Sequence, residues 1–158
     1  GGLGIDTLTG GDDNDSLDGG RNDDSLSGGL GNDTIRGDHG NDSIDAGDGD
    51  DTVIAGDGDD TVVGGIGNDA INGSDGNDIV NGMAGNDTIL GGDGFDTLAG
   101  GGGADIILGG DSDDVINGQG GTDTIAGGQG VDTITDPVNE IDENFTLSNA
   151  LLTALEAL

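Results

Sequence analysis

The sequence predicts an all-β solenoid, in which short strands and tight turns stack along one axis. The first 135 residues divide into fifteen nine-residue repeats without insertion or deletion, from GGLGIDTLT at residues 1–9 to GGQGVDTIT at residues 127–135. The sixth position of every repeat is Asp, and the eighth is always Leu, Ile or Val. The 158-residue chain also contains 38 glycines and only 1% aromatic residues, too little apolar material for an ordinary close-packed core.

Each repeat has two parts with different backbone preferences. The first six residues are rich in Gly, Asp and Asn, which favour positive φ and local hydrogen bonds, so they predict a tight turn. The last three, such as residues 34–36, are β-prone and place one apolar residue between two others. This pattern predicts a short strand whose middle side chain points inward.

A few positions depart from the glycine pattern. First positions are Gly except at Ala46 and Ala55, and the fourth-position exceptions are Asp13, Asn22 and Ser112. Asp and Asn tolerate left-handed backbone better than other non-glycine residues. The second-position exceptions are Asp38, Ser74, Met83 and Gln119. If the second position requires positive φ, Met83 and Gln119 each cost about 1 kcal/mol, and these turns mark weaker sites.

The strongly negative net charge of the chain limits the classes of molecule that it could bind. Arg21 and Arg36 are the only Lys or Arg residues beside 34 acidic ones, for a formal net charge of −32. Nucleic acid and anionic membrane surfaces would be repelled, and no apolar run is long enough to span a bilayer. The chain has no Cys to form disulfides. Such acidity is typical of disordered chains, so an ordered fold needs bound cations.

The repeats resemble the RTX (repeats-in-toxin) family of hemolysin-type calcium-binding repeats, whose nonapeptide is GGxGxDxUx. The resemblance covers residues 1–135. It implies a right-handed parallel β-roll, a β-solenoid with two repeats per turn, in which repeats i and i+2 stack on the same edge. It also implies calcium between stacked turns, held by carbonyls at positions one and three of one turn, by carbonyls at two and four of the other, and by both sixth-position carboxylates. The expected metal ligands are Asp6, Asp15, Asp24, Asp33, Asp42, Asp51, Asp60, Asp69, Asp78, Asp87, Asp96, Asp105, Asp114, Asp123 and Asp132.

Physical chemistry favours calcium independently of the resemblance. Stacked aspartates would lie about 5 Å apart and repel one another unless cations neutralise them. Calcium accepts mixed oxygen ligands with flexible geometry, whereas magnesium demands a strict octahedron. With no Cys and one His, softer metals are disfavoured. With two repeats per turn, as the resemblance implies, fifteen repeats leave thirteen gaps between stacked turns. Thirteen Ca²⁺ ions would then bring the charge of the repeat block, with 29 acidic residues and two arginines, from −27 to about −1.

The predicted function is that of a calcium-binding structural module that assists secretion of an extracellular or cell-surface bacterial protein. We expect the chain to be disordered without calcium and to fold on binding it. By resemblance, folding would follow export through the type I secretion machinery. No set of nucleophile, base and orienting residue is apparent, so the chain is not predicted to be an enzyme. His39 occupies a variable turn position and is expected to be exposed.

The last 23 residues, 136–158, depart from the period. Leu151, Leu152, Leu155 and Leu158 would share one face of a helix, which predicts a cap over the end of the roll. A type I secretion signal is the second interpretation of this segment, and the two are compatible.

Several alternatives stay open. The array begins at Gly1 without a leader, which suggests the non-catalytic module of a larger secreted protease, lipase, epimerase, adhesin or toxin. Ice binding is possible because Asn14, Asn32, Asn68 and Asn86 form an incomplete ladder, although the third positions on that edge lack Thr. Self-association could use outward-facing Leu90, Ile106 and Leu108, or the tail. An EF-hand is excluded because residues 1–135 lack the Glu that closes its loop.

Overall fold

The structure is a computed structural model that describes residues 1–136. Those residues form sixteen strands and no helix. The expected cap or signal at 136–158 therefore lies, apart from its first residue, outside the described residues. The strands are β1 (Gly2–Leu3), β2 (Thr7–Asp12), β3 (Ser16–Arg21), β4 (Ser25–Leu30), β5 (Thr34–His39), β6 (Ser43–Asp48), β7 (Thr52–Asp57), β8 (Thr61–Ile66), β9 (Ala70–Asp75), β10 (Ile79–Ala84), β11 (Thr88–Asp93), β12 (Thr97–Gly103), β13 (Ile106–Asp111), β14 (Val115–Gly121), β15 (Thr124–Gln129) and β16 (Thr133–Thr135).

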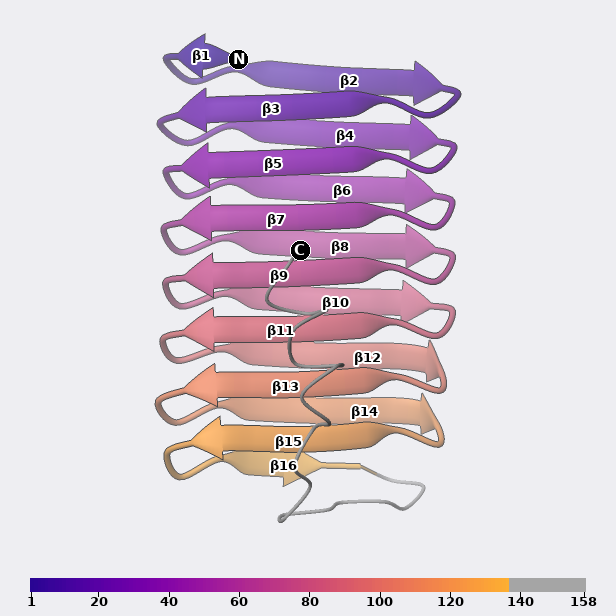
Figure 1. Ribbon diagram of the computed structural model, residues 1–158, viewed down its shortest axis with the longest axis vertical. Coiled ribbons are helices and arrows are strands. Elements are labelled where there is room, and N and C mark those ends of the chain that lie inside the picture. The colour runs from indigo at the N-terminus through magenta and orange to yellow at the C-terminus, as the bar shows by residue number, and fades with distance from the viewer. Residues whose placement is uncertain (137–158) are drawn as a thin grey trace, which may run out of the picture.

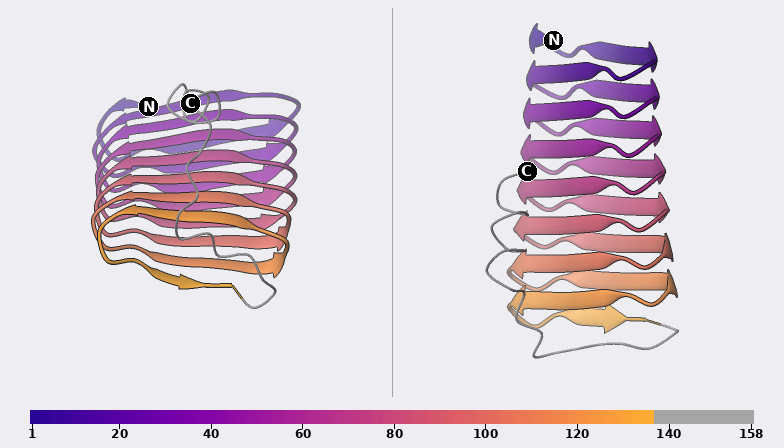
Figure 2. Two further views of the ribbon diagram at one scale, coloured as in Figure 1. Left: turned by 60° about the horizontal axis from the view of Figure 1, so that its bottom comes forward. Right: turned by 45° about the vertical axis from the view of Figure 1, so that its right-hand side comes forward.

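The strands form two parallel sheets that face one another. Odd-numbered strands, β1 to β15, make the odd-strand sheet, and even-numbered strands, β2 to β16, make the even-strand sheet. Each strand pairs with one two repeats away, so that Ile35 of β5 lies beside Val53 of β7. Successive strands alternate between the sheets as the chain coils along the roll (Figures 1 and 2). The predicted parallel β-roll with two repeats per turn is confirmed.

The strands are longer than the three residues expected. From β2 to β15 they begin at position seven and end at position three of the next repeat, as in Thr34–His39, except that β12 and β14 each extend one residue further. The glycine-rich first positions indicated a turn because glycine disfavours isolated strands. Here the neighbouring parallel turns supply hydrogen-bonding partners on both sides, and Asp38 of β5 pairs in register with Gly56 of β7. Tertiary pairing therefore overrides local preference.

The interior is a single column of aliphatic side chains from the eighth positions. These side chains are at most 2% exposed from Leu26 to Ile125, and the methyl groups of Ala46 and Ala55 join the same cluster. Leu17 and Ile134 pack against it near the ends. Because every inward position lies in register with its counterpart two repeats away, the core has the same narrow cross-section along the roll.

The turns depend on left-handed backbone at two positions of each repeat. Every second and every fourth residue of the fifteen repeats has positive φ. The non-glycine residues that adopt it are Asp13, Asn22, Asp38, Ser74, Met83, Ser112 and Gln119. The second position therefore does require positive φ, and Met83 and Gln119 adopt it with φ of 77° and 69°.

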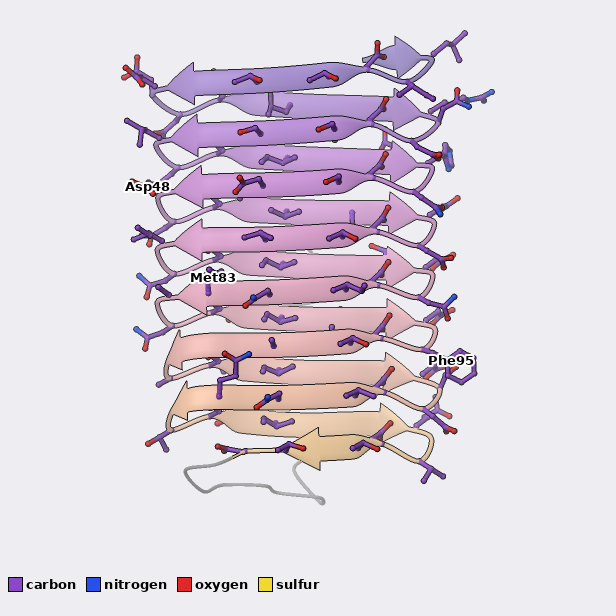
Figure 3. All side chains as sticks on the ribbon, turned by 180° about the vertical axis from the view of Figure 1, so that it is seen from behind. Asp48, Met83 and Phe95 are labelled. Atoms are coloured by element: carbon purple, nitrogen blue, oxygen red, sulfur yellow. The ribbon has the colours of Figure 1, made fainter. Side chains whose placement is uncertain are left out.

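The outer surface is largely polar, and several large apolar side chains project from it. Asp48 and Phe95 point outward from opposite edges (Figure 3), and Phe95 is 62% exposed. Leu90 of β11 pairs in register with Leu108 of β13, and both are half-buried on the odd-strand sheet. His39 is exposed, as expected, and its ring Nδ1 lies 2.8 Å from the Asp57 carboxylate. Within residues 1–136, no helix is long and apolar enough to cross a membrane.

Candidate calcium sites

The sixth-position aspartates lie in the turns, immediately before position seven starts the next strand. The structure stacks them in two columns, one along each edge of the roll, as the two-repeat turn requires. Aspartates from Asp24 to Asp123 are only 1–3% exposed. Asp6, Asp15 and Asp132 are half-buried because they lie in the terminal turns. Burial of so many carboxylates requires compensation, since an isolated buried charge is strongly disfavoured.

One oxygen of each sixth-position carboxylate from Asp24 to Asp132 fixes the spacing between turns. The Oδ1 atom accepts a hydrogen bond from the backbone N–H of the sixth-position Asp two repeats earlier. Asp51 accepts from Asp33 at 2.7 Å, and Asp69 accepts from Asp51 at 2.9 Å. The same bond recurs at every one of the thirteen gaps between stacked turns.

The other oxygen, Oδ2, has no hydrogen-bond partner. This holds for every sixth-position aspartate from Asp6 to Asp123, and in each the atom is buried. A buried oxygen without a partner costs about 1 to 3 kcal/mol, and more when it is charged. A column of such atoms indicates that a cation belongs beside them.

The first-position glycines show where these oxygens converge. A Cβ atom placed on Gly64 would lie 2.5 Å from Oδ2 of Asp69 and 2.8 Å from the carbonyl oxygen of Gly82 in the next turn. Eleven first-position glycines share this environment, with both oxygens within 3.0 Å of the Cβ point. We call this space, bounded by the glycine Cα, the carboxylate and the carbonyl of the next turn, the cradle. It brings together two acceptor oxygens, which are the hard ligands that calcium prefers.

The cradle would bind a cation through a carboxylate oxygen of one turn together with a main-chain carbonyl oxygen of the next. No group of three or more His, Cys, Asp or Glu side chains suited to a metal occurs in the part of the chain that the structure describes. Each gap instead offers the sixth-position carboxylates of two turns and main-chain carbonyls. Mixed carboxylate and carbonyl coordination is common for calcium, so the residues present fit this ion.

Burial raises the pKa of these carboxyl groups and so favours their protonated form below about pH 6 to 7. Desolvation, with a smaller contribution from like-charged neighbours, raises the pKa of Asp60 and Asp69 to about 7. Desolvation likewise raises the pKa of Asp78, Asp96, Asp105 and Asp114 to about 6. The hydrogen bond to Oδ1 acts in the opposite direction but is the weaker influence.

The fifth positions form hydrogen-bonded ladders on both edges of the roll, of which only the incomplete asparagine ladder of Asn14, Asn32, Asn68 and Asn86 was predicted. Asn32 N–H donates to Oδ1 of Asn14 at 2.9 Å, and Asn86 N–H donates to Oδ1 of Asn68 at 2.9 Å. A second ladder follows the other edge, where Asn77 donates to Asp59 through both its backbone and its side chain. These bonds lower the pKa of Asp59. Ten fifth positions are Asn or Asp, and this count was the signal available in the sequence.

The two ladders run in opposite directions. A fifth-position oxygen accepts from the following turn, whereas a sixth-position Oδ1 accepts from the preceding turn. Where the fifth position of the earlier turn is Asn or Asp, the pair of stacked turns is therefore joined by two hydrogen bonds of opposite direction, one from the fifth positions and one from the sixth. The outer ladder is exposed and satisfied by the protein alone, while the inner one retains its unpartnered Oδ2 atoms.

Comparison with known families agrees with this geometry. The family model for the RTX calcium-binding nonapeptide repeat (4 copies) matches residues 1–35, 28–62, 36–71, 63–98 and 99–134. No curated protein sequence matches the chain significantly. Since the matches span nearly all of the array that the structure shows as a roll, the chain belongs to the RTX calcium-binding nonapeptide repeat family.

Proposed function

We propose that the roll is a calcium-dependent structural module whose folding is driven by ions bound between stacked turns. The observation that carries the proposal is the column of buried, unpartnered Oδ2 atoms from Asp6 to Asp123. The ligands are the sixth-position aspartates at positions 6 to 132 together with main-chain carbonyls of the turns. Calcium supplies the positive charge that the column lacks.

Binding and folding form one equilibrium in this proposal. The aliphatic core is a single narrow column, and the turns contain many glycines, which lose more entropy on ordering than other residues. No cradle exists before two turns stack, because its oxygens come from both. The free energy of calcium binding is therefore free energy of folding.

The proposed setting is extracellular. Oxygen sites of extracellular modules have dissociation constants of about 0.1 to 1 mM, far above cytosolic calcium concentrations. A chain with such sites stays unfolded until it is exported, which suits passage through the type I secretion machinery. The roll would then serve as the non-catalytic module of a secreted bacterial protein.

Equilibrium dialysis against calcium and against magnesium tests the binding part of this proposal. We expect saturable binding of about ten or more calcium ions per chain and much weaker binding of magnesium, which resists dehydration and mixed carbonyl coordination. Equal uptake of the two ions, with a linear dependence on concentration, would indicate only a diffuse counterion atmosphere and would refute specific sites.

Self-association through the half-buried patch of Leu90, Ile106 and Leu108 is a separate part of the proposal. Ile106 and Leu108 are on β13, and Leu90 lies beside Leu108. Light scattering on the calcium-loaded chain, with and without truncation after Thr135, separates coverage by the tail from coverage by a second copy. A monomer in both cases would exclude the second copy.

A further inference from the structure

Two of the thirteen gaps differ from the rest at the residue that forms the cradle. Ala46 of β6 and Ala55 of β7 replace the first-position glycine, and both are fully buried. Their methyl groups belong to the aliphatic cluster of the core. The gaps concerned lie between repeats six and eight, at Asp51, and between repeats seven and nine, at Asp60.

At the first-position glycines of the other gaps, a Cβ atom would clash with both cradle oxygens, the carboxylate Oδ2 and the carbonyl of the next turn. Beside Gly73 and Gly91, for example, a carboxylate Oδ2 and the carbonyl of the next turn both lie within 3.0 Å of the Cβ point, closer than real Cβ atoms essentially ever come. An alanine can be accommodated only if these oxygens move away from the Cβ. The oxygens that would close around one ion at about 2.3 to 2.6 Å are then held apart by a methyl group.

The neighbouring core residues fit a methyl group at these two places. A Cβ on Gly64 would lie 3.1 Å from Cδ1 of Ile71, the eighth-position residue of the same repeat. In the two repeats that contain alanine, the eighth positions are Val53 and Val62, which have no Cδ atom. Because valine lacks the Cδ1 atom that would crowd a first-position methyl group, the methyl groups of Ala46 and Ala55 can pack within the aliphatic core.

The alanine turns retain their stacking. Across the first alanine gap the Asp51 amide still donates to Oδ1 of Asp69 at 2.9 Å, and across the second the Asp60 amide donates to Oδ1 of Asp78 at 2.9 Å. Register is thus maintained by the hydrogen bond while the cradle is filled by an apolar group.

We propose that the gaps beginning at Ala46 and Ala55 bind no calcium, so that an apolar belt separates two calcium-binding blocks. The inference rests on the proposed calcium sites and concerns their number and grouping. Two gaps, one in each column and at the same level of the roll, are filled by methyl groups, which leaves eleven. Five of these lie on the amino-terminal side of the belt and six on the carboxy-terminal side.

Calcium counts in four proteins test this inference: the unchanged chain, Ala46→Gly, the double variant Ala46→Gly with Ala55→Gly, and Gly73→Ala. Gly73 is the matched control because its repeat already has valine, Val80, at the eighth position, so an added methyl meets no Cδ atom. All four proteins have the same number of acidic residues. Bound calcium is measured by equilibrium dialysis followed by atomic emission. The dialysis buffer contains about 0.15 M salt, which weakens calcium binding to exposed carboxylates to the same extent in all four proteins.

We expect eleven ions in the unchanged chain, twelve in Ala46→Gly, thirteen in the double variant and ten in Gly73→Ala, with all four folded by circular dichroism. A count of thirteen in the unchanged chain that neither glycine variant alters would overturn the inference while leaving the proposed function intact. No saturable calcium in any of the four would overturn the proposed function itself.

Discussion

Replacing Asp69 by asparagine isolates the effect of burying one carboxylate without a cation. Asp69 is 2% exposed, its Oδ1 accepts from the Asp51 amide and its Oδ2 has no partner. The isosteric amide keeps the acceptor and loses the charge. It also places a donor at the Oδ2 position, which lies 2.5 Å from the Cβ point of Gly64, and the Gly82 carbonyl oxygen lies 2.8 Å from the same point. We therefore expect Asp69→Asn to stabilise the calcium-free roll.

The magnitude follows from the pKa of Asp69, which burial raises from 3.8 to about 7. At pH 8 that difference means that the ionised Asp69 carboxylate destabilises the folded, calcium-free roll by about 4 kcal/mol. Screening by nearby solvent reduces this destabilisation to roughly 2 kcal/mol. Because the folded-state pKa is raised, this penalty is complete above pH 7, declines as the pH falls through 7 and is almost gone near pH 4.

The assay is folding in excess chelator, driven by a stabilising osmolyte and followed by far-ultraviolet circular dichroism. At pH 8 the variant should fold at a lower osmolyte concentration than the unchanged chain, and near pH 4 the two should coincide. Asp75→Asn removes an equal charge from an exposed position and is the matched control. A gain of the same size in both variants, or one that persists at pH 4, would refute the argument from burial.

Three further predictions concern the backbone, the core and the pH response. Met83→Gly should raise the stability of the calcium-loaded protein by roughly 0.5 to 1 kcal/mol in thermal unfolding, because Met83 has a φ of 77°; Ala84→Gly, at the next residue, should not, since Ala84 has no positive φ. Ile89→Ala should lower stability by about 2 to 5 kcal/mol in the same measurement, because Ile89 is fully buried, and an equal loss on truncating exposed Val131 would contradict this. In chelator, strand signal should increase as pH falls from about 8 to 5, because the pKa values of Asp60 and Asp69 are raised to about 7 and protonation favours the folded state. In calcium the same protons compete with the ion, so half-saturation should need more calcium below pH 7; a midpoint independent of pH would count against carboxylate ligands.

The period of nine made most of the fold predictable. Invariant Asp and aliphatic positions locate the edge columns and the core without any structure, since side chains such as Ile35 and Val53 must lie in register once turns stack. The need for positive φ at position two could be stated only conditionally from glycine composition. Met83 and Gln119 show that non-glycine residues accept this conformation, each with a local hydrogen bond from its N–H to an Asn side chain two residues earlier.

Features that arise between turns were less accessible from the sequence. Strand pairing through positions one to three depends on parallel neighbours eighteen residues away, and local propensity does not contain that information. The opposite directions of the fifth- and sixth-position ladders depend on rotamers of adjacent side chains. The consequence of Ala46 and Ala55 became apparent only once the cradle oxygens were located beside the first-position Cα atoms.

The central claim is that calcium allows the roll to form, and circular dichroism at pH 8 tests it most directly. We expect the spectrum of a disordered chain in excess chelator, and a strand spectrum that appears cooperatively on adding calcium to about 10 mM and disappears when the ion is removed. An unchanged strand spectrum in chelator at this pH, where the buried aspartates cannot be neutralised by protons, would contradict the account.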